Sequence, residues 1–96
     1  MKDKLTITVP IADRSIKMRV ADGEEAFVRE AAQLINERID FYRAQPELKD
    51  IREILSRVAL DSMVARLKGD AEMAEWQNLV FKKVDDLRNR MTLPDN

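Results

Sequence analysis

The 96-residue sequence contains neither cysteine nor histidine. Without these side chains the chain cannot form a disulfide or the usual structural zinc site, and it has no Cys or His for nucleophilic or general-base catalysis. No cysteine pattern indicates an oxidising compartment. A soluble cytoplasmic protein is the expectation, with no metal site and no cofactor.

Glycine and proline are also scarce, with two and three residues respectively. Two isolated glycines cannot form a phosphate-binding loop. The carboxylate pairs Glu24–Glu25 and Asp85–Asp86 are adjacent in sequence, so their side chains point to different sides of a helix and do not form an acid/base pair. We therefore expect no catalytic residues and no enzymatic activity.

Neither sign of charge predominates, because 17 basic residues face 18 acidic ones and the net charge is −1. This balance disfavours nucleic-acid binding, for which Lys17 and Arg19 are the main cue. No apolar run approaches the roughly 20 residues of a membrane span, so membrane insertion is not expected.

Two segments near the N-terminus, 5–11 and 16–20, alternate apolar and polar residues with period two. This pattern predicts two half-buried strands, joined by a hairpin loop over 12–15. Pro10 cannot donate to a strand ladder, which favours an edge position or a bulge. A lone hairpin is marginal in water, so it should pack on a helix.

A first helix is expected to begin at Asp22, which with Glu25 has the spacing of a capping box, and to end near Arg43. Its apolar residues, together with Arg38 at the same helical spacing, form a broad stripe. We interpret the stripe as core against the hairpin and the second helix, with a partner groove as the alternative. The stripe comprises Phe27, Val28, Ala31, Leu34, Ile35, Arg38, Ile39, Phe41 and Tyr42.

A second, much longer helix is predicted to begin within a few residues of Pro46 and to continue through Gly69 to Met91, followed by a frayed end over Thr92–Asn96. Such a rod cannot be covered by so short a chain, which predicts self-association. We divide the chain into a head, 1–67, and a coiled-coil stalk, 68–96. The first apolar stripe of this helix includes Leu48, Ile51, Leu55, Val58, Ala59, Met63 and Leu67.

The predicted oligomerisation residues of the stalk recur mostly at steps of three and four. The interval from Met73 to Val84 is eleven residues, nearer to a straight or right-handed bundle than to a strict heptad coil. The residues are Met73, Trp76, Val80, Phe81, Val84, Leu87 and Met91.

Several short motifs, in this order, resemble the ZapA family of bacterial cell-division proteins. They are Arg14-Ser15 between the strands, Ala31-Ala32, Ile35-Asn36-Glu37-Arg38-Ile39, and Val58-Ala59-Leu60 before a C-terminal coil. The resemblance implies an α+β fold with a dimeric head and an antiparallel stalk that joins two dimers. It also implies binding to the tubulin-like GTPase FtsZ, bundling of its protofilaments, and a place at the division site.

The resemblance suggests charged FtsZ contacts on the head: Arg14 on the hairpin loop, Lys17, Arg52 and Glu53. Two positions depart from the family pattern. Asp13 stands where the family usually has glycine before the loop arginine, and Arg52 stands where an acidic residue is common. From the residues alone, an exposed loop arginine without a role is the simpler interpretation of Arg14.

Two alternatives to an FtsZ adaptor remain. One is a nucleic-acid-binding dimer built from a strand and two helices, and the other is an oligomerisation module with another partner. A basic strand or helix face would favour the first of these.

Overall fold

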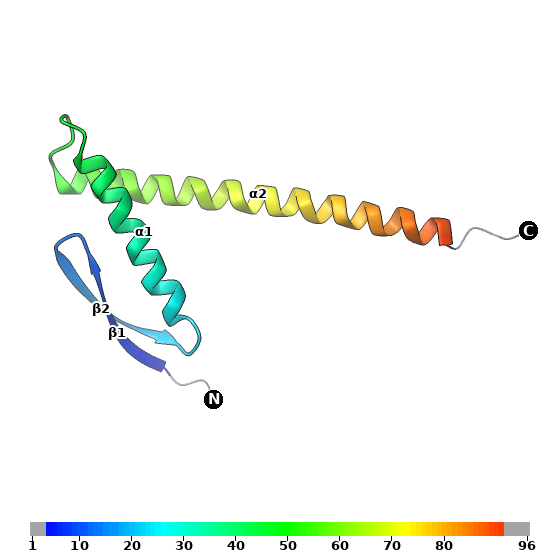
Figure 1. Ribbon diagram of the computed structural model, residues 1–96, viewed down its shortest axis with the longest axis horizontal. Helices are drawn as coiled ribbons and strands as arrows, with labels where there is room; N and C mark the ends of the chain where they lie inside the picture. Colours follow the sequence, from blue (N-terminus) through cyan, green and yellow to red (C-terminus); the bar gives the residue numbers. More distant parts are fainter. Residues whose placement is uncertain (1–3, 92–96) are drawn as a thin grey trace, which may run out of the picture. The chain divides into compact units, whose positions relative to one another are not determined.

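The computed structural model describes residues 4–91, which form an antiparallel hairpin followed by two helices (Figure 1). The α+β fold predicted from the sequence is therefore confirmed, while the predicted frayed end lies outside the described residues. The elements are β1 (Lys4–Ile11), β2 (Arg14–Ala21), α1 (Glu25–Arg43) and α2 (Ile51–Met91).

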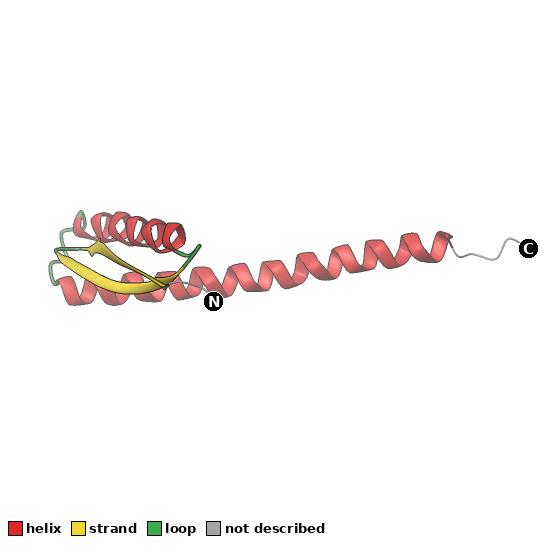
Figure 2. Cartoon of the chain, turned by 90° about the horizontal axis from the view of Figure 1, so that it is seen from below, coloured by secondary structure: helices red, strands yellow, loops and turns green. Residues whose placement is uncertain are grey.

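The chain divides into two compact units, one ending at Ala59 and the other beginning at Leu60. The first contains the hairpin, α1 and the first turns of α2, and the second contains the rest of α2. Coloured by secondary structure, the two helices and the hairpin are readily distinguished (Figure 2). Each unit is described by itself below.

The hairpin turn is shorter than predicted, because only Ala12 and Asp13 lie between the strands. The register pairs Ile11 with Arg14 and continues without a bulge to Lys4 and Ala21. Ala12 has a φ of 56°, the left-handed value that a two-residue hairpin turn requires at its first position. The prediction that Arg14 lies in a loop was therefore wrong: it is the first residue of β2.

Directly paired residues place the apolar side chains of both strands on one face of the sheet. On β1, Ile7 and Val9 are buried, whereas their partners Met18 and Ile16 on β2 stay exposed. The difference arises because α1 packs against β1. The hairpin thus has the helical support expected from its sequence. On β2, Val20 is buried with Ile7 and Val9, whereas Ile16 and Met18 remain exposed.

Helix α1 begins later than the proposed capping box, and Glu24 occupies its N-cap position without a side-chain hydrogen bond. The residues before it form a β-turn in which the Glu24 N–H donates to the Ala21 carbonyl at 3.0 Å. Gly23, with a φ of 91°, supplies the positive φ of a type II turn. Asp22 is used in this turn, so its predicted capping role was wrong. The C-terminal end at Arg43 is confirmed.

The predicted apolar stripe of α1 separates into two faces. Its core side contributes Ile39 and Tyr42, which are buried. Ala32, which the predicted stripe did not include, is buried as well, whereas the predicted Ala31 is exposed. The second face, which carries Phe27, Leu34 and Phe41 at intervals of seven residues, is exposed. The sequence interpretation as core was therefore right for the first face and wrong for the second.

Helix α2 begins at Ile51, where Asp50 accepts a hydrogen bond on Oδ1 from the Arg52 N–H at 2.9 Å. This side-chain bond makes Asp50 the N-cap, a role that sequence analysis did not assign. Leu48 anchors the connection in the core. The most buried residue of the helix is Ile54, at 1% exposure, whereas the predicted core residue Leu55 is exposed.

The helix continues through Gly69 without interruption, as predicted. Met63 and Leu67 were assigned to the same stripe as Ile51 and Val58. Both are exposed, and both lie in the second unit. That part of α2 covers residues 60–91 and is roughly 48 Å long at a rise of about 1.5 Å per residue.

Ile54→Ala should lower the free energy of unfolding by about 2–5 kcal/mol, because it leaves a cavity between α2 and α1. Urea unfolding at one fixed protein concentration measures the change. Leu55→Ala removes the same number of carbon atoms from the neighbouring exposed position and should cost about 1 kcal/mol or less. Equal losses in the two variants would contradict the assigned core.

Candidate partner-binding surfaces

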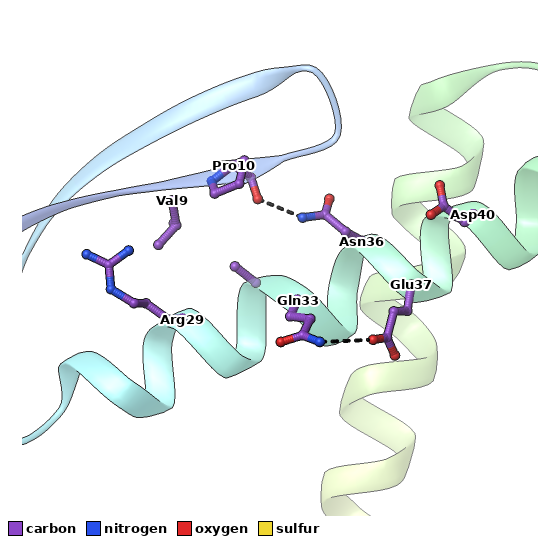
Figure 3. Close-up of a pocket in the computed structure, with 8 residues that line it drawn as sticks. Val9, Pro10, Arg29, Gln33, Asn36, Glu37 and Asp40 are labelled. Atoms are coloured by element: carbon purple, nitrogen blue, oxygen red, sulfur yellow. Dashed lines mark hydrogen bonds between the residues drawn. The ribbon is translucent and has the colours of Figure 1, made fainter.

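The tip of the hairpin is fixed to α1 by the side-chain amide of Asn36 (Figure 3). Its Nδ2 donates to the Pro10 carbonyl and its Oδ1 accepts from the Ala12 N–H, both at 2.8 Å. One amide thus satisfies a donor and an acceptor of the turn. These bonds hold the left-handed Ala12 in place and define the direction in which β2 leaves the turn.

A groove of about 310 Å³ lies between β1 and α1. The Gln33 amide in it donates to Glu37 at 3.4 Å, and Arg29 forms an ion pair with Glu25 at 2.8 Å. The residues lining it include no Cys or Ser that could act as a nucleophile and no His that could act as a general base. We interpret the groove as the polar seam around Asn36. Its lining is Val9, Pro10, Arg29, Ala32, Gln33, Asn36, Glu37 and Asp40.

Strand β2 carries three exposed cations, Arg14, Lys17 and Arg19. Within residues 4–91, none of the three forms an ion pair. Lys17 and Arg19 lie on the face opposite the apolar face, since they pair with Thr8 and Thr6. Arg14 lies on the apolar face, beside the turn. The cations are therefore free to bind an anionic partner.

Arg52 and Glu53 lie in the first turn of α2, and the Arg52 side chain is 91% exposed. Its guanidinium is 3.9 Å from Asp50, a surface ion pair that contributes little stability. The hairpin tip, which carries Arg14, and the start of α2 are connected through the core. Ile11 and Ala12 of the hairpin pack on the cluster that contains Ile54 of α2. The hairpin tip and the start of α2 thus share one core cluster, although no contact joins Arg14 to Arg52 or Glu53 among the described interactions.

A second candidate surface runs along α2 from Leu60 to Met91, where no residue is buried and only Asp61 is partly covered. All seven predicted oligomerisation residues of this segment are exposed in the single chain, from Val80 at 38% to Met91 at 82%. Leu60, Met63 and Leu67 are exposed as well. Contiguous exposed apolar residues of this kind are typical of protein–protein interaction sites.

The apolar pattern of this segment repeats after eleven residues. Met73, Trp76 and Val80 recur as Val84, Leu87 and Met91, and the same offset towards the N-terminus gives Ser62, Ala65 and Gly69. An eleven-residue shift returns to nearly the same side of an α-helix. The repeated face thus changes from small residues to large apolar ones along the helix. Phe81 lies off this face.

Across residues 4–91, no group of three potential metal-binding side chains is present, and no helix has the length and hydropathy needed to span a bilayer. The fold and the two surfaces define a small α+β protein that carries exposed cations on strand β2 of the hairpin and exposed apolar residues on a long helix. Both surfaces are of the kind that binds other proteins.

The family model of the cell division protein ZapA matches residues 7–91, nearly the whole chain. The chain belongs to the ZapA family, which is associated with FtsZ and bacterial cell division. The resemblance stated from its motifs is thereby confirmed.

A solved structure described as an unknown conserved bacterial protein from Pseudomonas aeruginosa PAO1 has a similar fold. The TM-score is 0.62 at 20% sequence identity, and the alignment covers 90% of this chain and 94% of the other. At this identity the likeness shows the fold alone. No curated protein matched the sequence.

Sequence analysis quoted Asn36 as part of a motif but assigned it no role. The signal was available, because an asparagine on the core side of a helix needs polar partners. It also missed the exposed face of α1 that carries Phe27, Leu34 and Phe41, since all three were assigned to one broad stripe. The roles of the predicted contacts Arg14, Lys17, Arg52 and Glu53 stay predictions.

Asn36→Ala should lower the free energy of unfolding by about 1–3 kcal/mol, because the Pro10 carbonyl and the Ala12 N–H lose their partner. Urea denaturation at fixed protein concentration provides the measurement. Gln33→Ala, on the same helix, removes only a 3.4 Å bond and should stay within about 0.5 kcal/mol. An unchanged stability in Asn36→Ala would exclude a structural role for these bonds.

Proposed function

We propose that this protein is a cell-division adaptor that binds FtsZ and bundles its protofilaments as a homotetramer, a dimer of dimers. It acts in the cytoplasm at the division site and has no enzymatic activity. Membership of the ZapA family is the observation that carries the proposal. The exposed apolar length of α2 supports the oligomeric part, and the unpaired cations of β2 support the partner-binding part.

The stalk, proposed as residues 68–96, joins the chains through the seven oligomerisation residues named above. Copies of the chain offer the cover that a single copy lacks, because each carries the same repeated apolar face. An antiparallel arrangement has two-fold symmetry and places identical heads at its two ends. The small residues Ser62, Ala65 and Gly69 permit a close approach between helices at one end of that face.

The head, proposed as residues 1–67, contacts FtsZ through Arg14, Lys17, Arg52 and Glu53. These side chains come from β2 and from the first turn of α2. Ile11 and Ala12, which precede β2 at the hairpin turn, pack on the core cluster that contains Ile54 of α2. Exposed charges contribute more to encounter rate and specificity than to affinity. Each head thus binds weakly and reversibly, and bundling depends on two heads acting together.

Arg14→Glu should abolish co-sedimentation with FtsZ and GTP while leaving the molecular mass unchanged, because it reverses a charge at the proposed contact. Pelleting at several salt concentrations and multi-angle light scattering measure the two properties. Lys68→Glu makes the same charge change in the second unit and should pellet like the parent protein. FtsZ binding that survives Arg14→Glu would remove this residue from the proposed site, and an unmodified protein that never pellets with FtsZ would reject the function.

Val84→Glu should convert tetramers into dimers, because it places an unpaired carboxylate in the proposed apolar seam. Light scattering gives the mass, and circular dichroism reports whether the secondary structure is intact. Lys82→Glu makes a larger change of charge on a different side of the helix and should leave the mass unchanged. A tetramer that persists in Val84→Glu would show that this residue lies outside the interface.

A further inference from the structure

We propose that the free edge of β2 receives an extended, acidic segment of the partner as a third strand of the sheet. The inference rests on the proposed function and gives it a binding mode, since Lys17 lies at the centre of this edge. It adds main-chain hydrogen bonds to the side-chain charges already considered. Strand addition to an open edge is a recurring mode of peptide recognition.

The register shows which backbone groups point outward. In an antiparallel pair joined by a two-residue turn, Ile11 and Arg14 exchange both hydrogen bonds, and bonded and non-bonded pairs then alternate. Ser15, Lys17 and Arg19 therefore direct their N–H and C=O groups away from β1. Pro10, the partner of Ser15, agrees with this alternation. Its carbonyl points away from β2 and accepts a hydrogen bond from Asn36.

The edge of β2 is open, whereas that of β1 is obstructed. For the outward groups of Ser15, Lys17 and Arg19, residues 4–91 supply no hydrogen-bond partner. On β1, Pro10 has no N–H to donate and its carbonyl is occupied by Asn36. Side chains of α1, including Arg29, border the groove beside β1 (Figure 3). An added strand would therefore pair with β2.

The two faces of β2 specify the side chains of the added strand. One face presents Ile16 and Met18, which are 43% and 37% exposed. The other presents Lys17 and Arg19, and no acidic residue lies on this face of the described hairpin. Side chains on adjacent strands pair on each face, with opposite charges and apolar contacts favourable. The complementary segment alternates apolar residues with Asp or Glu.

A second copy of the chain fits this edge poorly. Two β2 strands paired about a two-fold axis would place Lys17 opposite Lys17, or Lys17 opposite Arg19, in the central registers. Like charges directly opposite one another are destabilising, and cations on edge strands are a common device against self-pairing. Charge complementarity therefore favours an acidic partner over self-association at β2.

The main test compares one proline substitution on each strand edge in the full-length protein. Ser15→Pro removes one outward N–H without a change of charge, and should weaken binding to FtsZ about fivefold to tenfold, as expected for a lost backbone hydrogen bond with some distortion of the edge. Thr6→Pro makes the matched change on β1, since Thr6 has the same phase, and should bind like the parent protein. Equal binding by the two variants, both folded by circular dichroism, would overturn the inference.

A second measurement avoids proline altogether. Amide hydrogen exchange should slow at Ser15, Lys17 and Arg19 on binding, and not at Thr6 or Thr8. The probes are FtsZ with GTP and a capped six-residue peptide of alternating valine and glutamate, with alternating valine and lysine as the control peptide. Protection by the acidic peptide alone supports the proposed chemistry, whereas absence of protection at β2 by both FtsZ and the acidic peptide overturns it.

The outcomes separate this inference from the function on which it rests. FtsZ binding that falls in Lys17→Gln but not in Ser15→Pro, with no protected amides, would leave the adaptor function standing and reject strand addition. Protection by the acidic peptide without any FtsZ binding would reject the function and retain the site. Tighter binding to a DNA duplex than to either protein probe at physiological salt would overturn the proposed partner chemistry.

Discussion

The lack of cover along α2 is the constraint on which the rest depends. From Leu60 to Met91 the helix has large apolar side chains and no buried residue. Burial of apolar surface contributes roughly 25 cal/mol for each Å², so a helix in this state is stabilised strongly by any partner that covers it. An isolated helix otherwise depends on weak local propensity. The family membership and the uncovered apolar face are the two observations that support the proposed association of this segment.

In the first unit, a very small core has to hold the hairpin in a fixed position. Among residues 4–59, nine buried hydrophobic residues support it, in two clusters that both include residues of α1. Asn36 completes this arrangement because its amide bonds the hairpin turn, where apolar contacts alone cannot satisfy backbone groups. The cations of β2 consequently lie on a strand of defined register, although the core beneath them is small.

Sequence reasoning succeeded where a pattern has one structural solution. Period-two alternation located both strands, and the absence of helix-stopping residues carried α2 correctly through Gly69. It failed where two local solutions compete. Asp22 suits a helix cap and a turn equally, and Gly23 decided for the turn. Ile54 and Leu55 both continue a three–four spacing, and only packing against α1 selects Ile54. Arg14 changed from loop to strand because the turn needs only two residues.

The charges and the open edge of β2 together indicate how a weak contact with a partner becomes selective. A charged surface patch tolerates many anionic partners, because surface electrostatics depend little on geometry. A strand edge is stricter, since its hydrogen bonds require an extended backbone and its alternate side chains require a matching sequence. β2 combines the two features within the stretch from Arg14 to Arg19. With such a head, the affinity of a single contact stays low. Under the proposed tetramer, paired heads on one stalk would retain only partners that repeat the same segment along a filament.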